Sequence, residues 1–477
     1  MWESSFKTSS EIRKGSETRG HKEVNIRMIS FARSIGRGHS TLVNFSQHLN
    51  SPPPLTLPAY TTIASKVGDA SREVGEESMV KAALEVRQYV DQAKSDTDPM
   101  KCGVSVDGSW QRRGHSSHNG VVTAISVETG KCLDVSVLTN VCRSCQRWEK
   151  RKGTAQYEIW KAEHRCTINH VGSAGSMEAI GSVQIFQRSV EAPRYLKYTR
   201  YLGDGDSASF KKVVESKPYG EEEEIVKLEC VGHVQKRVGT RCRRLKQDLK
   251  GKKLEDGKGI AGTGRLTDKM IDTLQNYYGF AIRQNAGNLP GMIKAVKAIL
   301  GHLSSTDQDP NHEFCDASWC GFLKDPNTYR HKNALPKCII KLLEPIFNDL
   351  TSESLLQKCL HGKTQNNNEC LNKLIWDRCS KEYFVERKTV EEAVYSAVAH
   401  FNDGASSILK VLNKLGVSPG YYTGQLCTAK DVQRIKKSAC RSTEVAKKHR
   451  KNKRAVKKGF LDSLPQTDKE MYDPGAH

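Results

Sequence analysis

The sequence predicts an α/β protein whose mixed sheet is interrupted by a small cysteine- and histidine-rich insertion and by an all-helical insertion. Three observations predict this class: β-branched runs between 101 and 139, alternating strand-like and helix-like runs up to 233, and Lys-rich segments with helical spacing over 234–360. A meander followed by alternating strands and helices requires a mixed sheet with covered faces. The 477 residues suffice for about three domains.

The charge balance points to an acidic polymer as partner. Lys and Arg number 75 against 54 Asp and Glu, a net charge of +21, which favours nucleic acid first and an anionic membrane second. The sequence has neither an apolar stretch long enough to span a membrane nor an N-terminal secretion signal. The 15 cysteines are therefore expected in a reducing compartment, as metal ligands or small buried side chains.

The chain ahead of the sheet divides into two segments. Residues 1–59 are basic and Ser-rich, and the Pro-rich run at 51–58 cannot continue a helix, so we expect this segment to be poorly ordered. Residues 60–100 are expected to form a helical lead-in. Apolar residues recur there at spacings of four, three and four, typical of an amphipathic helix: Met79, Ala83, Val86 and Val90.

Residues 101–233 are expected to form the first part of the core. Its strands are expected at 101–110, 120–130, 131–139, 196–206 and 224–233, and its helices at 176–191 and 207–215. Three hairpin strands, helix, strand, helix, strand is the order of a ribonuclease-H-like core.

The remaining segments are a Cys/His insertion at about 140–172, a mainly α insertion at 234–360, final core helices at 361–405 and a basic tail at 406–477.

Three acids stand where a ligand site is expected. Asp107 ends the first strand, Asp204 ends a later strand just before a helix, and Glu369 lies near the start of a helix at 364–379. Singly, each has an ordinary interpretation as a turn or solvated residue. Together, two Asp and a Glu offer hard oxygen ligands for two Mg²⁺ or Mn²⁺ ions, which suits phosphodiester chemistry on a polyanion.

Six motifs lie in register along the chain. They are VSVDGSWQRRGH, NHVGSAGSMEAIG, YLGDGDSASF, KLECVGHVQKR, QNYYGFAIRQN and TQNNNECLNKLIW. In this order, over roughly residues 60–405, the chain resembles the Mutator-like transposase domain of animal mobile elements. The resemblance implies a DDE-type catalytic core on a ribonuclease-H-like fold. Asp107 would be the first acid, Asp204 the second, with Asp206 in reserve, and Glu369 the third.

Cysteine and histidine spacing predicts zinc. The resemblance matches the short motif Cys230-x2-His233, whose residues either join a metal site or pack beside the acids. Independently, one set in the Cys/His insertion has the spacing of a structural zinc site, with His164 as a substitute ligand and free thiols as the alternative. A more irregular set leaves zinc and a loop with buried cysteines equally open. The first set is Cys142, Cys145, Cys166 and His170, and the second is His302, His312, Cys315 and Cys320.

Basic runs predict double-stranded DNA as the partner. The run 236–253 holds nine Lys or Arg and one Asp, and is either a solvated face or a track along the phosphate backbone. Arg112 and Arg113 follow Asp107 closely enough to clamp a nucleotide. A second basic run at 441–458 favours nuclear import. The residues of the first track are Lys236, Arg237, Arg241, Arg243 and Arg244.

Two functions are consistent with these features. The first is a transposase that cleaves DNA at element ends and joins it to a target, which would require two ends to be brought together and so favours a homo-oligomer. The second is a domesticated or inactive transposase-derived protein that binds DNA through its zinc modules and basic tracks. Because all three acids are present, the sequence gives no internal reason to call the chain inactive.

Overall fold

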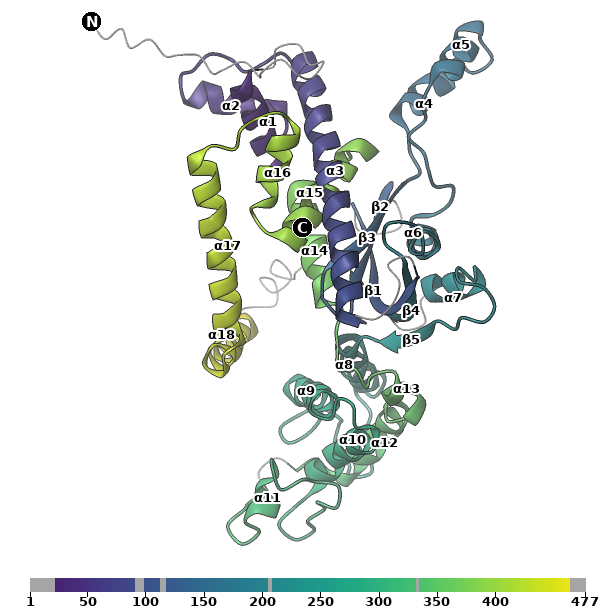
Figure 1. Cartoon of the computed structure of the whole chain (residues 1–477). Coiled ribbons are helices and arrows are strands. Elements are labelled where there is room, and N and C mark those ends of the chain that lie inside the picture. Colours follow the sequence, from purple (N-terminus) through teal and green to yellow (C-terminus); the bar gives the residue numbers. More distant parts are fainter. Residues whose placement is uncertain (1–21, 91–97, 112–116, 205–207, 332–333, 464–477) are drawn as a thin grey trace, which may run out of the picture. The chain divides into compact units, whose positions relative to one another are not determined.

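The structure is a computed structural model that describes residues 22–90, 98–111, 117–204, 208–331 and 334–463 (Figure 1). The chain divides into two compact units. One is Asn25–Asn402, and the other combines Met1–Val24 with Asp403–His477. Arg112, Arg113 and Asp206 lie outside the described residues. Among the described helices, none is long and apolar enough to cross a membrane.

The larger unit is built on one five-stranded mixed sheet with the order β3-β2-β1-β4-β5. The first three strands form the expected antiparallel meander, β4 pairs in parallel with β1, and β5 pairs in parallel with β4. The strands are β1 (Met100–Trp110), β2 (Asn119–Ser126), β3 (Cys132–Thr139), β4 (Leu196–Gly203) and β5 (Val226–Glu229).

The register of β1 against β4 positions the two aspartates. Ser105 lies opposite Leu202 in this parallel pair. Continuing the register by two residues brings Asp107 level with Asp204, directly after the end of β4. Asp107, three residues before the end of β1, and Asp204, directly after β4, therefore lie level with each other toward the carboxyl edge of the sheet, where α/β proteins bind ligands.

Helices cover both faces of the sheet, as the alternation of β1 requires. Val104 and Val106 pack in one core with α6 (Ala174–Arg188). The opposite face is covered by α14 (Asn366–Arg378) and α15 (Arg387–Asp403), which pack on β2 and β3. Ser105 and Asp107 point to this second face and meet α14. The short helix α7 (Ala208–Glu215) packs beside α6.

The α insertion has its own hydrophobic core. Apart from an isolated bridge between Lys253 and Gly259, its described elements are helices. They are α8 (Val231–Asp248), α9 (Asp268–Gln284), α10 (Leu289–Ser304), α11 (Gly321–Lys324), α12 (Lys337–Leu350) and α13 (Glu353–Gln357). The strand expected at 224–233 ends at Glu229, because Val231, Val234 and Val238 instead form the buried stripe of α8.

Two segments are more ordered than the sequence predicted. Within residues 1–59, the structure places α1 (Glu23–Ser34) and α2 (His39–His48), and Ile26 and Ile29 of α1 are buried. Charged residues surround the weak apolar stripe of α1, so the sequence pattern did not predict this helix. Tertiary packing decides that the stripe is buried. The lead-in helix α3 (Leu57–Val90) begins three residues before the segment 60–100 that was expected to be helical. The tail contains α16 (Ser407–Lys414), α17 (Tyr421–Ser442) and α18 (Glu444–Ser463).

Candidate functional site

Asp107 is held at the end of β1 by an amide from α14. Asn372 donates a hydrogen bond from Nδ2 to Asp107 Oδ2 at 2.7 Å. One and two turns earlier, Asn368 and Gln365 bond to the same strand: Asn368 accepts from Ser105 Oγ at 2.6 Å, and Gln365 Nε2 donates to the Val106 carbonyl at 2.8 Å. These amides share one helix face, so they fix the start of α14 against β1.

This attachment determines where Glu369 lies. Glu369 follows Asn368 in the first turn of α14 and is exposed, while Leu371 and Ile375 are buried toward the sheet. Its charge acts on the neighbouring acid at β1. Glu369 is therefore close enough to Asp107 for its charge to affect that carboxylate, although the two residues are 262 positions apart in the sequence.

Negative charge is crowded at Asp107. Burial, then the charges of Glu178 and Glu369, raise the pKa of Asp107 to about 6, against the opposing hydrogen bonds of Asn372 and the Gly108 backbone. Glu178 comes from α6, and burial raises its own pKa. A Cβ atom at Gly108 would lie 2.7 Å from Glu178 Cγ. The glycine after Asp107 thus makes room for a fourth carboxylate that the sequence analysis missed.

Asp204 reaches the same edge from β4. Its Oδ1 contacts Nδ1 of His233 in the first turn of α8, and its side chain is 66% exposed. Burial, with the charges of Lys236 and Arg237, lowers the pKa of His233, while Glu369 opposes this shift. Glu369 therefore acts electrostatically on both Asp107 and the histidine that contacts Asp204. These interactions connect the three expected acids at one edge of the sheet.

Cys230 and His233 point to different surroundings. Cys230 is buried ahead of α8, where its sulfur accepts the Gln365 backbone N–H at 3.4 Å. His233 is half-buried beside Asp204. Within the described residues, neither belongs to a group of metal-ligand side chains. The geometry therefore agrees with the packing alternative: the cysteine holds the loop before α14, and the histidine holds the second acid.

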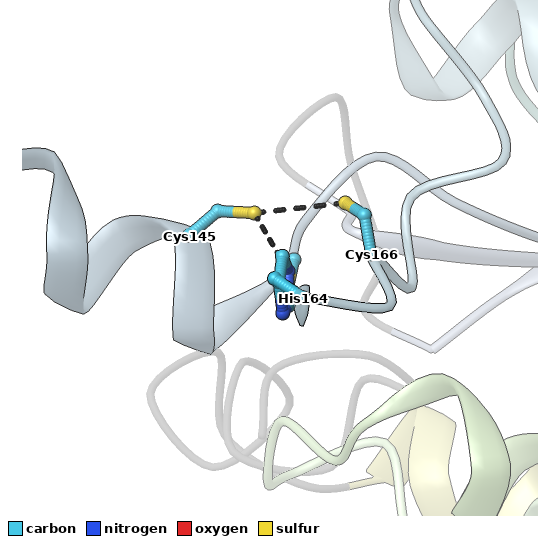
Figure 2. A group of neighbouring side chains, drawn as sticks. Cys145, His164 and Cys166 are labelled. Carbon is cyan, nitrogen blue, oxygen red and sulfur yellow. Dashed lines mark hydrogen bonds between the residues drawn. The ribbon is translucent and has the colours of Figure 1, made fainter. Parts of the chain in front are cut away.

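The first Cys/His group assembles with one change from the expected ligands. Figure 2 shows Cys145, His164 and Cys166 facing one another; Cys145 Sγ lies 3.2 Å from His164 Nε2 and 3.6 Å from Cys166 Sγ. Cys142 Sγ lies 3.5 Å from the same nitrogen. His164, the substitute ligand, takes the place expected for His170. His170 is only 4% exposed and bonds instead to Ser176 Oγ at 3.0 Å.

The local secondary structure brings the side chains of this group together. Its residues lie on either side of a hairpin of α4 (Arg143–Trp148), a 3-10 turn, η1 (Glu149–Arg151), and α5 (Ala155–Glu163). Trp160 stacks on His164 with ring centroids 4.4 Å apart. Burial raises the pKa of Cys142, but hydrogen bonds from Thr167 and Cys145 outweigh it and lower that pKa to about 6. The pKa of Cys145, which donates one of these hydrogen bonds, is raised to about 12, so Cys142 is the one of the two that more readily forms the thiolate that binds metal.

The second expected group also assembles in full. His302 Nδ1 and His312 Nδ1 are 3.3 Å apart. Cys315 Sγ lies 3.5 Å and Cys320 Sγ 3.4 Å from His312 Nδ1, and they lie 3.7 and 3.9 Å from His302 Nδ1. In a tetrahedral zinc site, ligand atoms lie about 3.3 Å (N to N) to about 3.8 Å (S to S) apart. Both groups have the dimensions of such a site.

Comparison with known families agrees with the resemblance indicated by the sequence motifs. A family model described as Mutator-like transposase matches residues 1–320. The chain belongs to the Mutator-like transposase family. A search of curated proteins found no match. The family match covers Asp107, Asp204 and both Cys/His groups, whereas Glu369 lies beyond it.

A Mutator-like transposase acts on DNA, and a basic pocket includes Asp204 in its lining. The pocket has a volume of about 480 Å³. Several arginines of the expected track already bind acids of the chain: Arg237 bonds to Glu229 at 2.8 Å, Arg241 pairs with Asp349, and Arg243 bonds to Asp272 at 2.7 Å. The pocket is lined by Asp204, His233, Lys236, Arg237, Thr240 and Arg241.

Two cations of the track differ from these arginines. Arg244 is highly exposed, and its salt bridge to Asp248, at 3.9 Å, is longer than those of the three arginines above. Lys236 has no salt bridge within the part of the chain that the structure describes, and it lines the pocket beside Asp204. Lys236 is therefore the cation best placed to meet a phosphate next to the acids.

Proposed function

We propose that this chain is a DNA transposase that cleaves phosphodiester bonds and transfers strands at element ends, using two divalent ions held by Asp107, Asp204 and Glu369. The core is a ribonuclease-H-like fold. The observation that carries this proposal is the placement of Asp107 level with Asp204 on adjacent strands, with α14, which bears Glu369, hydrogen-bonded to Asp107 through Asn372. The family match supports the DNA substrate.

The donor set fits Mg²⁺ or Mn²⁺. Carboxylate oxygens are the hard ligands that these ions prefer. The pKa of Asp107 is raised first by burial and then by the charges of Glu178 and Glu369, and bound cations would offset these effects by stabilising the ionised carboxylate. Two such ions, when bound, supply activation of the attacking oxygen and stabilisation of the leaving oxygen.

The protein's own residues orient the site and bring DNA to it. Asn372 fixes the Asp107 carboxylate, and His233 restrains Asp204. Lys236 attracts a backbone phosphate into the pocket next to Asp204. The partner is double-stranded DNA, recognised mainly through its backbone. Because its proposed substrate is DNA, the protein is proposed to act in the nucleus. Joining two DNA ends favours an oligomer.

Both Cys/His groups are proposed to hold structural zinc. Each offers four nitrogen or sulfur ligands within 4.8 Å of one another. Thiolate and imidazole ligands at tetrahedral separations favour zinc over hard cations. The first ion would close the α4–α5 hairpin, whose aromatic packing consists mainly of Trp148 stacked on Trp160.

A DNA-binding protein without cleavage is the second candidate. The exposed position of Asp204 favours it, because the carboxylate contacts His233 and the acids do not form a compact ligand group among the described residues. Such a protein would keep the zinc groups and the basic pocket. It would bind duplex DNA with salt-sensitive affinity but leave the strands intact.

Nicking of labelled duplex DNA in Mn²⁺ separates these functions. The full chain is expected to nick DNA, and Glu369→Gln is expected to abolish nicking while leaving salt-dependent DNA binding unchanged. Glu353→Gln, an exposed glutamate of α13, is the matched control and should nick normally. Binding without nicking by the unmodified chain would favour the second candidate, and normal nicking by Glu369→Gln would remove this residue from the site.

A further inference from the structure

The second Cys/His group continues outward through two more side chains. His312 directs Nδ1 toward the ligand atoms of His302, Cys315 and Cys320. Its other nitrogen, Nε2, lies 2.9 Å from Nε2 of His331. The Nδ1 atom of His331 lies 2.7 Å from Asp307 Oδ1, which also accepts the His331 backbone N–H at 2.9 Å. The side chain of His331 is 5% exposed.

These contacts determine which nitrogens carry protons. An ionised carboxylate only accepts hydrogen bonds, so His331 must donate to Asp307 from Nδ1–H. In a neutral His331 ring, Nε2 then carries a lone pair and accepts a hydrogen bond. His312 must therefore donate from Nε2–H, which leaves its own Nδ1 unprotonated and directed at the other three ligands.

The opposite arrangement would prevent metal binding. If His331 donated to His312 from Nε2, a neutral His312 would carry its proton on Nδ1. That proton would point toward the cysteine sulfurs and His302, where an ion would have to sit. The Asp307–His331 pair thus favours the one neutral tautomer of His312 that leaves Nδ1 able to bind metal.

We propose that Asp307 and His331 are the outer shell of a zinc site formed by His302, His312, Cys315 and Cys320, and that they fix His312 for binding through Nδ1. This inference rests on the zinc assignment proposed above and extends it to residues that do not touch the ion. Asp307 and His331 are positioning residues, because they act through His312.

The position of the site in a loop explains why a fixed orientation and tautomer of His312 matter. The loop between α10 and α12 has α11 as its one described helix, and α11 has four residues. Its small core combines Cys315 and Cys320 with Phe314 and Phe322. His302 belongs to α10 and the other ligands to the loop, so the ion would tie the loop to a helix of the insertion core. Zinc sites of this kind contribute directly to folding.

Zinc release from the purified full chain tests the proposal. We expect Asp307→Asn and His331→Phe to retain two zinc ions per chain but to lose one of them to a chromogenic chelator about 10 to 100 times more readily than the unmodified protein. Asp309→Asn is the matched control, because this exposed acid of the same loop bonds to Lys337 at 2.8 Å. It should release zinc at the normal rate. Unchanged release from both test variants would overturn the proposal.

Nitrogen NMR with ¹⁵N-labelled histidine tests the tautomer of His312 in the unmodified chain. We expect His312 in the zinc-loaded chain to have a metal-bound Nδ1 and a protonated Nε2, with Cys315→Ser used to assign the signal. Metal binding through Nε2 would contradict the outer-shell assignment alone. If Cys315→Ser leaves the zinc content unchanged, this group holds no zinc, and the underlying zinc assignment fails instead.

Discussion

The two Cys/His groups and the acid edge are both sets of metal-ligand side chains, but they differ in how completely the fold assembles them. In each Cys/His group, four ligand atoms lie within 4.8 Å of one another. Among the described residues, Asp107, Asp204 and Glu369 form no such group, and Asp204 is 66% exposed and held by a histidine. The soft-ligand sites are compact, whereas the acidic site is open.

Charge explains this difference. Thiols and neutral imidazoles can lie together before an ion arrives, because protons or hydrogen bonds satisfy them. Carboxylates repel one another, and burial together with Glu178 and Glu369 raises the pKa of Asp107 to about 6. An acidic site can therefore close fully only with cations and phosphate present. Closure around cations is what the proposed catalytic site requires, and an acidic edge that stays open with cations and DNA present would favour the DNA-binding candidate. The permanent assembly of the Cys/His groups suits structural ions.

The sharpest test of this comparison removes one ligand from each kind of site and measures the effect on both nicking and zinc content. Asp107→Asn should reduce nicking on the order of 10³-fold, about 4 kcal/mol of barrier, and leave both zinc ions bound. Cys145→Ser should instead lose one zinc and expose the α4–α5 hairpin to trypsin. Nicking assays, elemental analysis and proteolysis measure these outcomes. Loss of zinc from Asp107→Asn would show that the sites are not independent.

Asp107→Asn should also stabilise the fold at neutral pH without divalent ions. The folded-state pKa of Asp107 is raised from 3.8 to about 6, so its stabilising contribution is full below pH 3.8 and is lost as pH rises through about 6. A neutral amide avoids that loss, and we expect a gain of about 1 to 3 kcal/mol at pH 7 that disappears near pH 3. Urea unfolding at both pH values measures it; destabilisation at pH 7 would contradict the charge crowding.

Asn372→Leu should affect catalysis through Asp107. The amide stabilises the ionised carboxylate, so its loss should raise the Asp107 pKa further. At low Mn²⁺, protons compete with the ion, and the acid limb of the pH–rate profile should move upward by about one pH unit. Asn366→Leu, an exposed residue of the same helix, is the control. A uniform loss of activity at all pH values would point to a purely structural effect.

Lys236→Ala should have the smallest effect. Loss of one phosphate contact should weaken DNA binding several-fold and reduce the slope of log affinity against log salt by about 1. Arg243→Ala should change the slope less, because Arg243 already bonds to Asp272 at 2.7 Å. Equal effects of the two substitutions in a salt titration would indicate that the pocket has no special role.

Much of the architecture was predictable because local pattern and burial agree. Because side chains alternate along a strand, the sequence of β1 predicts Val104 and Val106 on one face and Asp107 on the other, and the structure has this division. The order of strands and helices in the core followed from the strand-like and helix-like runs along the sequence. The N-terminal helices were missed because the apolar stripe of α1 is narrow and lies among charged residues, so burial rather than propensity decides its structure.

The sequence predicted most residues of the candidate sites, but not all of them. His164 and His170 both follow the cysteines at plausible spacing, and loop geometry decides between them: Trp160 stacks on His164, while Ser176 engages His170. Glu178 lies inside a long helix, where sequence cannot tell which residue faces β1. Gly108, directly after the expected acid, was the available signal, since a missing side chain permits close approach.

The most direct measurement is a crystal structure of the chain with a DNA end and Mn²⁺, with anomalous data at the manganese and zinc edges. We predict two manganese peaks, about 3.5 to 4 Å apart, bound by Asp107, Asp204 and Glu369, and one zinc peak in each Cys/His group. Manganese bound elsewhere, or acids that remain apart when DNA is present, would contradict the proposed catalytic site.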